Sequence, residues 1–163
     1  MYSYSSPIHR QNSSTRPSEI ETLIQEGEYR RALSLLAAEL AASPDQPDVH
    51  KLAGRAWQGL GEVERAREAY TRAIQIAPDY AEVYVNLGGL AATRQEWATA
   101  VQYFRQAITI NPNFAGAYRN LARALTQLGD EVASLEAWRE ALRLEPDAIP
   151  LALNRQLAQR WLA

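Results

Sequence analysis

The sequence has no cysteine among its 163 residues and only two histidines, His9 and His50. Without cysteine there is no disulfide, no thiolate metal ligand and no thiol nucleophile. We also find no nucleophile placed beside a base, no cluster of metal-ligating residues and no glycine-rich phosphate loop. The sequence therefore predicts a protein that is not an enzyme and binds neither a cofactor nor a metal.

Long apolar runs are missing as well. The longest, around residues 33–38, ends at Glu39, far short of the about 20 apolar residues that a membrane-spanning helix needs. Residues 1–16 are rich in serine and lack the apolar stretch of a secretory signal. We expect no membrane span, a disordered N-terminal tail over residues 1–16 and a cytoplasmic location.

The chain also lacks a large excess of positive or negative charge. The chain has 17 Lys and Arg against 19 Asp and Glu, and a formal net charge of -2. Such a balance gives no general attraction to nucleic acid or to anionic membranes, although a local basic patch on one face is compatible with it. We expect no nucleic-acid partner.

What the sequence does contain is a repeat of 34 residues. Its marker is a proline followed by a short polar residue, at Pro44-Asp45, Pro78-Asp79, Pro112-Asn113 and Pro146-Asp147. Self-similarity at this period is typical of stacked supersecondary units, because a single unit cannot bury its apolar face without its neighbours. The period therefore predicts a stack of similar units.

A second periodic break divides each unit into two helices. It falls at Gly27, Gly61, Gln95 and Gly129. Glycine suits a helix end where the chain passes through positive φ, whereas Gln95 has to adopt that conformation without glycine's freedom. The polar residue of each marker is expected to be the N-cap of the following helix, as is Ser18 for the first helix.

Small and bulky positions also repeat within the second helix of each unit. The small position holds Ala32, Ala66, Ala100 and Ser134, and the bulky position four residues later holds Leu36, Tyr70, Phe104 and Trp138. A further small position follows at Ala73, Ala107 and Ala141. Small residues facing large ones let neighbouring helices pack closely, so we expect these positions to form the core.

In this order, the pattern resembles that of tetratricopeptide repeat proteins. The unit with the best match carries it in Tyr84, Leu87, Gly88, Ala100, Phe104, Ala107 and Pro112. The resemblance implies an all-α fold, an α-α superhelix of three full repeats with a degenerate first repeat and a C-terminal capping helix. The expected domain, residues 17–163, divides into the degenerate repeat at 17–46, the full repeats at 47–80, 81–114 and 115–148, and the capping helix at 149–163.

The same resemblance implies that the first helices of successive units line a concave groove where a ligand binds. The helical period places four cations on that face, Lys51, Arg55, Arg119 and Arg123. Because arginine pairs bidentately with carboxylate and phosphate, these residues favour an acidic protein or peptide segment as the ligand. The alternative is that they belong to an ordinary solvated helix face.

Asparagines occupy one groove position in three successive units, at Asn86, Asn120 and Asn154. A side-chain amide can donate to and accept from the main chain of an extended peptide, and similar asparagine ladders hold peptides in some tetratricopeptide superhelices. The alternative is local capping or contact with solvent. The match to the carboxylate clamp of this family is only partial, because Gly116 stands where the clamp has a lysine and Asn120 where it has an arginine.

The last segment leaves two packing arrangements open. Leu153, Leu157 and Trp161 form an apolar stripe on what would be the groove side. Either this helix rotates to bury the stripe against the preceding repeat, which would displace Asn154 from the ladder, or the stripe is exposed and supports a homo-oligomer.

Together these patterns predict a non-catalytic protein–protein interaction module, a scaffold or adaptor that binds a peptide or protein segment in its concave groove. Two alternatives stay open. One is an N-terminal targeting module of a larger bacterial transferase, and the other is a self-associating tetratricopeptide assembly factor.

Overall fold

The computed structural model describes residues 16–146, which form eight helices with no strand among them. The helices are α1 (Arg16–Gln25), α2 (Tyr29–Ala42), α3 (Pro47–Gly59), α4 (Val63–Ile76), α5 (Ala81–Thr93), α6 (Trp97–Ile110), α7 (Ala115–Leu128) and α8 (Glu131–Leu144). The predicted all-α repeat architecture is confirmed. Residues 1–15 of the predicted tail and the predicted capping helix at 149–163, with Asn154 and the apolar stripe, lie outside the described residues.

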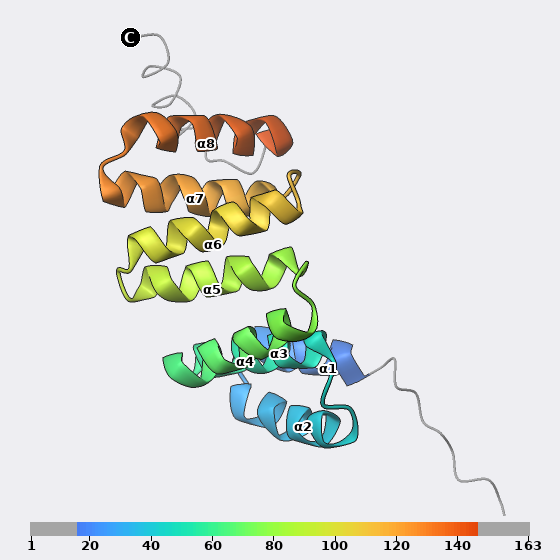
Figure 1. Ribbon diagram of the computed structural model, residues 1–163. Helices are drawn as coiled ribbons and strands as arrows, with labels where there is room; N and C mark the ends of the chain where they lie inside the picture. Colours follow the sequence, from blue (N-terminus) through green and yellow to red (C-terminus); the bar gives the residue numbers. More distant parts are fainter. Residues whose placement is uncertain (1–15, 147–163) are drawn as a thin grey trace, which may run out of the picture.

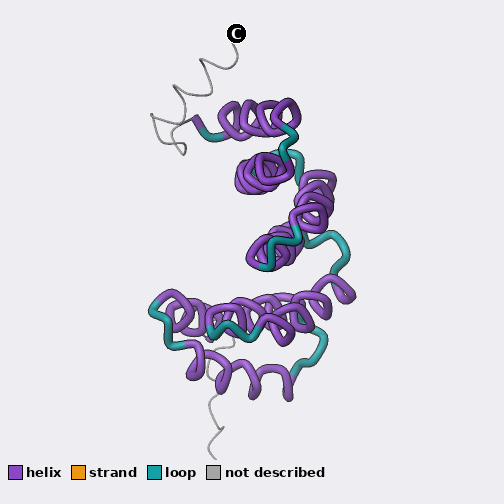
Figure 2. The backbone as a smooth tube through the Cα atoms, turned by 90° about the vertical axis from the view of Figure 1, so that its left-hand side faces the viewer, coloured by secondary structure: helices purple, strands orange, loops and turns teal. Residues whose placement is uncertain are grey.

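The helices pair in chain order, and the pairs stack into a curved solenoid (Figure 1). α3 packs on α4, α5 on α6 and α7 on α8, while α2 packs on α3 and α6 on α7 to join successive pairs. Figure 2 shows α5–α8 nearly end-on, whereas the helices of the N-terminal half run across the view. The stack therefore turns between α4 and α5.

The turn inside each pair passes through positive φ, as predicted. The four residues involved are Gly27, Gly61, Gly129 and Gln95, with φ of 80°, 76°, 79° and 61°. The backbone of Gln95 is held in the left-handed conformation, which disfavours residues with a Cβ. This position therefore carries backbone strain that its three glycine counterparts avoid.

We expect Gln95→Gly to raise the free energy of unfolding by about 0.5–1 kcal/mol, because relief of the left-handed strain exceeds the entropy that glycine adds to the unfolded chain. Urea-induced unfolding followed by circular dichroism measures the change. The reverse substitution, Gly129→Gln, is the matched control and should lower stability by a similar amount. Equal stability of all three proteins would contradict the strain at Gln95.

The N-cap prediction is wrong for the first helices of the full repeats. Their N-caps are Gln46, Tyr80 and Phe114, which form no side-chain cap hydrogen bond. The proline and the polar residue of the markers at 44–45, 78–79 and 112–113 instead lie in a tight turn before the cap, closed at one site by Tyr80 N donating to Ala77 O at 3.2 Å. The fourth marker ends at Asp147, outside the described residues. Because proline's fixed φ suits such a turn, the marker repeats for turn formation and not for capping. Ser18 likewise lies inside α1, which begins at Arg16.

The predicted core positions are buried in α2, α4 and α6, whereas Trp138, the predicted bulky position of α8, is only partly buried. Ala32, Ala66, Ala73, Ala100, Ala107 and Ala141 are each 0% exposed. The bulky rings meet the preceding helix at a glycine, because a Cβ on Gly54 would overlap the Tyr70 ring and a Cβ on Gly88 would overlap the Phe104 ring. These two contacts are one repeat apart, so both helix pairs close through the same glycine–ring contact.

Ion pairs bridge the turn of the stack on the side of α4. Arg94, just after α5, reaches Glu64 of α4, with Nη1 2.5 Å from Oε1, and its Nε lies 2.7 Å from Glu96 Oε1. Arg67 also donates to Glu64, and the hydrogen bonds from Arg67 and Arg94 lower the pKa of that carboxyl. Because these groups are solvated, the cluster orients α4 and α5 more than it stabilises them.

None of the helices in the described part of the chain combines the length and the apolar character needed to cross a membrane.

Candidate binding groove

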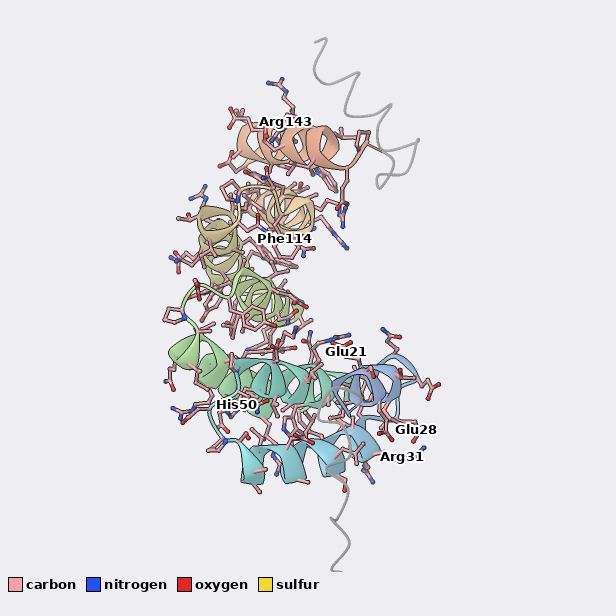
Figure 3. All side chains as sticks on the ribbon, turned by 90° about the vertical axis from the view of Figure 1, so that its right-hand side faces the viewer. Glu21, Glu28, Arg31, His50, Phe114 and Arg143 are labelled. Carbon is pink, nitrogen blue, oxygen red and sulfur yellow. The ribbon has the colours of Figure 1, made fainter. Side chains whose placement is uncertain are left out.

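The first helices of the full repeats, α3, α5 and α7, contact one another in succession along one side of the solenoid. Seen from the side in Figure 3, the chain curves like a C between Arg143 near one end and Glu28 and Arg31 near the other, with α5 and α7 on the inner side of the curve. This inner side is the face of the solenoid on which a ligand is predicted to bind.

Lys51 is buried and neutralised within the fold. Its side chain is 9% exposed, and its Nζ lies 3.0 Å from Glu82 Oε2 of α5 and 3.4 Å from Asp48 Oδ1 of α3. The ammonium group also lies 5.0 Å from the centre of the Tyr80 ring. Burial by itself lowers the pKa of Lys51, but the hydrogen bonds with Tyr80 and Glu82 outweigh it and raise this pKa above its ordinary value. Lys51 therefore joins α3 to α5. Because these carboxylates offset its positive charge, Lys51 contributes little to the attraction of an anionic ligand.

Arg119 of α7 is also engaged within the chain. Its Nη1 lies 2.5 Å from Glu145 Oε2, just beyond the end of α8, and its side chain is 33% exposed. The ion pair leaves part of the guanidinium accessible but offsets its charge. Two of the four predicted groove cations are thus paired with carboxylates of the fold.

Arg55 and Arg123 differ from these two. Neither forms a salt bridge or a side-chain hydrogen bond with any residue between 16 and 146. Arg55 is partly buried on α3 and Arg123 is exposed on α7. Burial raises the pKa of the Tyr70 phenol, and the nearby positive charge of Arg55 offsets part of that rise. The two arginines occupy the same position of the repeat, and Gly89 of α5 holds that position between them.

Asn86 has a buried amide nitrogen without an acceptor. Its Nδ2 is enclosed by the fold and donates to no atom of the described chain. A buried donor left unpaired costs about 1–3 kcal/mol. Of the other two predicted ladder residues, Asn120 lines a cleft between α5 and α7, and Asn154 lies outside the described residues. Asn86 is therefore the ladder residue with an unmet hydrogen bond.

The cleft between α5 and α7 has a volume of about 320 Å³. Its lining includes Gly89, Trp97, Phe104, Asn120, Arg123 and Gln127. The two aromatic rings come from α6, which packs on both α5 and α7, so α6 supplies apolar surface between the small residues of α5 and the more polar face of α7. The structure thus brings Asn120 and Arg123 together at one cleft.

Gly89 is not among the residues predicted to bind a ligand, although the helical period places it on the same face as Asn86. Glycine carries no functional group, so a search for chemistry passes over it. The available signal was positional, because the residues one repeat before and one repeat after Gly89 are both arginine. A glycine that replaces a long side chain in a groove leaves space.

The N-terminal end of the inner side has the opposite charge. A second cleft, of about 350 Å³, lies among α1, α2 and α3, and its lining includes three carboxylates, Glu21, Glu39 and Asp48, against one cation, Lys51. An anionic ligand is repelled from this end and attracted towards α7. Within residues 16–146 no group of three or more His, Asp or Glu side chains is placed to hold a metal ion.

Three family models, each described as a tetratricopeptide repeat, match residues 23–87, 81–114 and 103–136. The three matches overlap and together run without a gap from the end of α1 into α8. No curated protein matches the sequence.

Solved structures with the same fold include MamA and PilF. MamA aligns at 21% identity over 78% of this chain and 74% of its own, with a TM-score of 0.69. A second MamA structure aligns at 23% identity over 84% of this chain and 81% of its own, with a TM-score of 0.66. PilF of Pseudomonas aeruginosa aligns at 23% identity over 82% of this chain and 61% of its own, with a TM-score of 0.77. Identities of this size show the fold alone.

Proposed function

This chain belongs to the tetratricopeptide repeat family, and on that premise we propose that it is a protein-interaction scaffold whose groove holds an acidic protein segment. The observation that carries the proposal is the pair of arginines without a carboxylate partner in the described chain, Arg55 on α3 and Arg123 on α7. Lys51 and Arg119 stay outside the proposed contact because carboxylates of the fold already pair with them.

The distribution of charge along the groove favours one placement of the ligand's carboxylates. Arg123 lies at the α7 end, whereas Glu21 and Asp48 line the cleft at the α1 end. A segment with carboxylates therefore places them on α7 and α3 and keeps its uncharged part over α5. There, a rotation of the Asn86 side chain would bring its amide nitrogen, buried and unpaired in the free chain, to a main-chain carbonyl of the segment. Two guanidinium–carboxylate pairs and a few such hydrogen bonds support an affinity near micromolar, about -8 kcal/mol.

Loss of both arginines should weaken binding of a fluorescein-labelled poly-glutamate peptide to the whole chain. We expect Arg55→Gln with Arg123→Gln to raise the dissociation constant by roughly tenfold, because each exposed charge pair contributes up to about 1 kcal/mol. Fluorescence anisotropy measures the constant. The affinity of the parent should also fall as salt is added, since salt screens exposed charges.

The matched control is Arg30→Gln with Arg105→Gln, which removes the same charge from exposed positions of the second helices α2 and α6. This variant should bind like the parent. An equal loss in both double variants would mean that the peptide responds to net charge and not to the groove, and no loss in either would refute the proposed contact.

A further inference from the structure

Gly89 lies inside a helix where the fold gives no reason for glycine. A Cβ at this position of α5 would meet no atom within 4 Å. Its neighbour Gly88 differs, because a Cβ there would overlap the ring of Phe104. Glycine is among the poorest helix formers, so its presence in a helix interior needs a compensating cause. Packing supplies that cause for Gly88 and not for Gly89.

What Gly89 provides is open space in the groove. It lines the cleft between α5 and α7, at the repeat position that holds Arg55 in the unit before and Arg123 in the unit after. A side chain at this position would occupy the cleft. The cleft has about 320 Å³, against the roughly 10–15 Å³ that one water needs by the same measure. It is large enough to admit a side chain of a ligand.

The walls of the cleft define what that side chain must be. Trp97 and Phe104 of α6 contribute aromatic surface, and Ala124 of α7 adds a methyl group. Arg123 lies at the same cleft and forms no ion pair with any described residue. Apolar surface beside a free guanidinium complements an apolar group that stands next to a carboxylate.

We propose that the cleft at Gly89 binds a bulky apolar side chain, aromatic or leucine-like, from a protein segment in which an adjacent carboxylate pairs with Arg123, and that Gly89 determines this specificity by leaving the cleft open. The inference rests on the proposed function and narrows its ligand from any acidic segment to one with an apolar residue beside Asp or Glu.

Phenylacetate is a probe that carries both groups, an aromatic ring and a carboxylate. Added to the whole chain, labelled with nitrogen-15, it should shift the amide resonances of Gly89, Thr93 and Arg123 in a saturable manner. Benzyl alcohol, which lacks the carboxylate, and acetate, which lacks the ring, should each bind more weakly. Arg123→Gln should weaken phenylacetate by roughly two- to fivefold, the range for an exposed charge pair, and bring it to the level of benzyl alcohol.

Substitution of Gly89 tests the space directly. Gly89→Leu should weaken phenylacetate at least about tenfold, while Gln106→Leu, at an exposed position of α6 outside the cleft, should have no effect. Gly89→Ala is a second variant that the fold accommodates, since its Cβ meets no atom, and should give an intermediate loss. Circular dichroism checks that each variant is folded. Unchanged binding in Gly89→Ala together with Gly89→Leu, or acetate binding as tightly as phenylacetate, would overturn the proposal.

This outcome can be separated from that of the proposed function. If poly-glutamate binds through Arg55 and Arg123 but phenylacetate binds without regard to Gly89, the inference fails and the acidic-segment function stands. If phenylacetate binds at the cleft and poly-glutamate does not bind at all, the acidic-segment function fails and the cleft remains a site for an apolar carboxylate.

Discussion

Lys51→Ala is expected to lower the free energy of unfolding by about 3 kcal/mol. The substitution removes the cation that lies 3.0 Å from Glu82 and 3.4 Å from Asp48, and so leaves two carboxylates of neighbouring helices facing each other. It also removes the apolar stem that this 9% exposed side chain packs between α3 and α5. The loss stays below that of a fully buried pair because Glu82 is 47% exposed and remains hydrated.

Two further variants separate the contribution of the charge of Lys51 to this loss of stability from that of its apolar stem. Lys51→Met keeps most of the stem and should lose about 1–2 kcal/mol, the part due to charge. Arg72→Ala is the matched control, because Arg72 pairs with Asp45 at the same distance of 3.0 Å but is 49% exposed, and it should lose less than about 1 kcal/mol. Urea-induced unfolding measures all three. A loss in Lys51→Ala no larger than in Arg72→Ala would contradict the structural role of Lys51.

The same lysine gives stability a dependence on pH with a defined sign. Hydrogen bonds with Tyr80 and Glu82 raise its pKa in the folded chain despite the opposing effect of burial. The stabilisation is therefore complete below the unfolded pKa of about 10.4 and is lost as the pH rises through the folded pKa. Burial raises the pKa of Tyr70 and Tyr80 and acts in the same direction. Unfolding free energy should fall above about pH 10 in the parent, and less steeply in Lys51→Met.

Gly88→Ala should lower stability by about 2 kcal/mol although alanine is the better helix former. The new Cβ would overlap three atoms of the Phe104 ring, which is 2% exposed and packed in the core. Overpacking of a rigid core costs about 1–3 kcal/mol, and overlap with a ring places this site at the upper end, above the about 1 kcal/mol gained in helix propensity.

The neighbouring glycine is the control for this prediction. Gly89→Ala should raise stability by up to about 1 kcal/mol, because it gains helix propensity without a steric contact. In the Gly88→Ala background, Phe104→Leu should cost less than it does alone, since the smaller side chain removes the overlap. A double-mutant cycle measures this coupling, expected at about 1 kcal/mol. Additive effects, or a stability change of the same sign in Gly88→Ala and Gly89→Ala, would contradict the contact.

The repeat pattern located the core and the turns because both depend on short-range geometry. A small residue followed by a bulky one four positions later lies on one helix face in any helix, and Ala66 with Tyr70 is buried accordingly. Glycine marks a helix end that needs positive φ. The equivalence of Gln95 to three glycines was enough to predict a positive φ there, and the structure has 61°. The marker misled where two local structures share one composition, because Pro78-Asp79 suits both a turn and a cap.

The sequence by itself determined that paired helices stack every 34 residues and which small and bulky positions of their second helices pack together. Helical periodicity is a property of a single helix, so it can be read along the chain. Only the tertiary structure decided that Lys51 and Arg119 are neutralised while Arg55 and Arg123 are not, and that a cleft opens at Gly89. Ion pairs such as that of Lys51 with Glu82 join different repeats, and their formation depends on how one repeat is rotated against the next, which no spacing within a helix specifies.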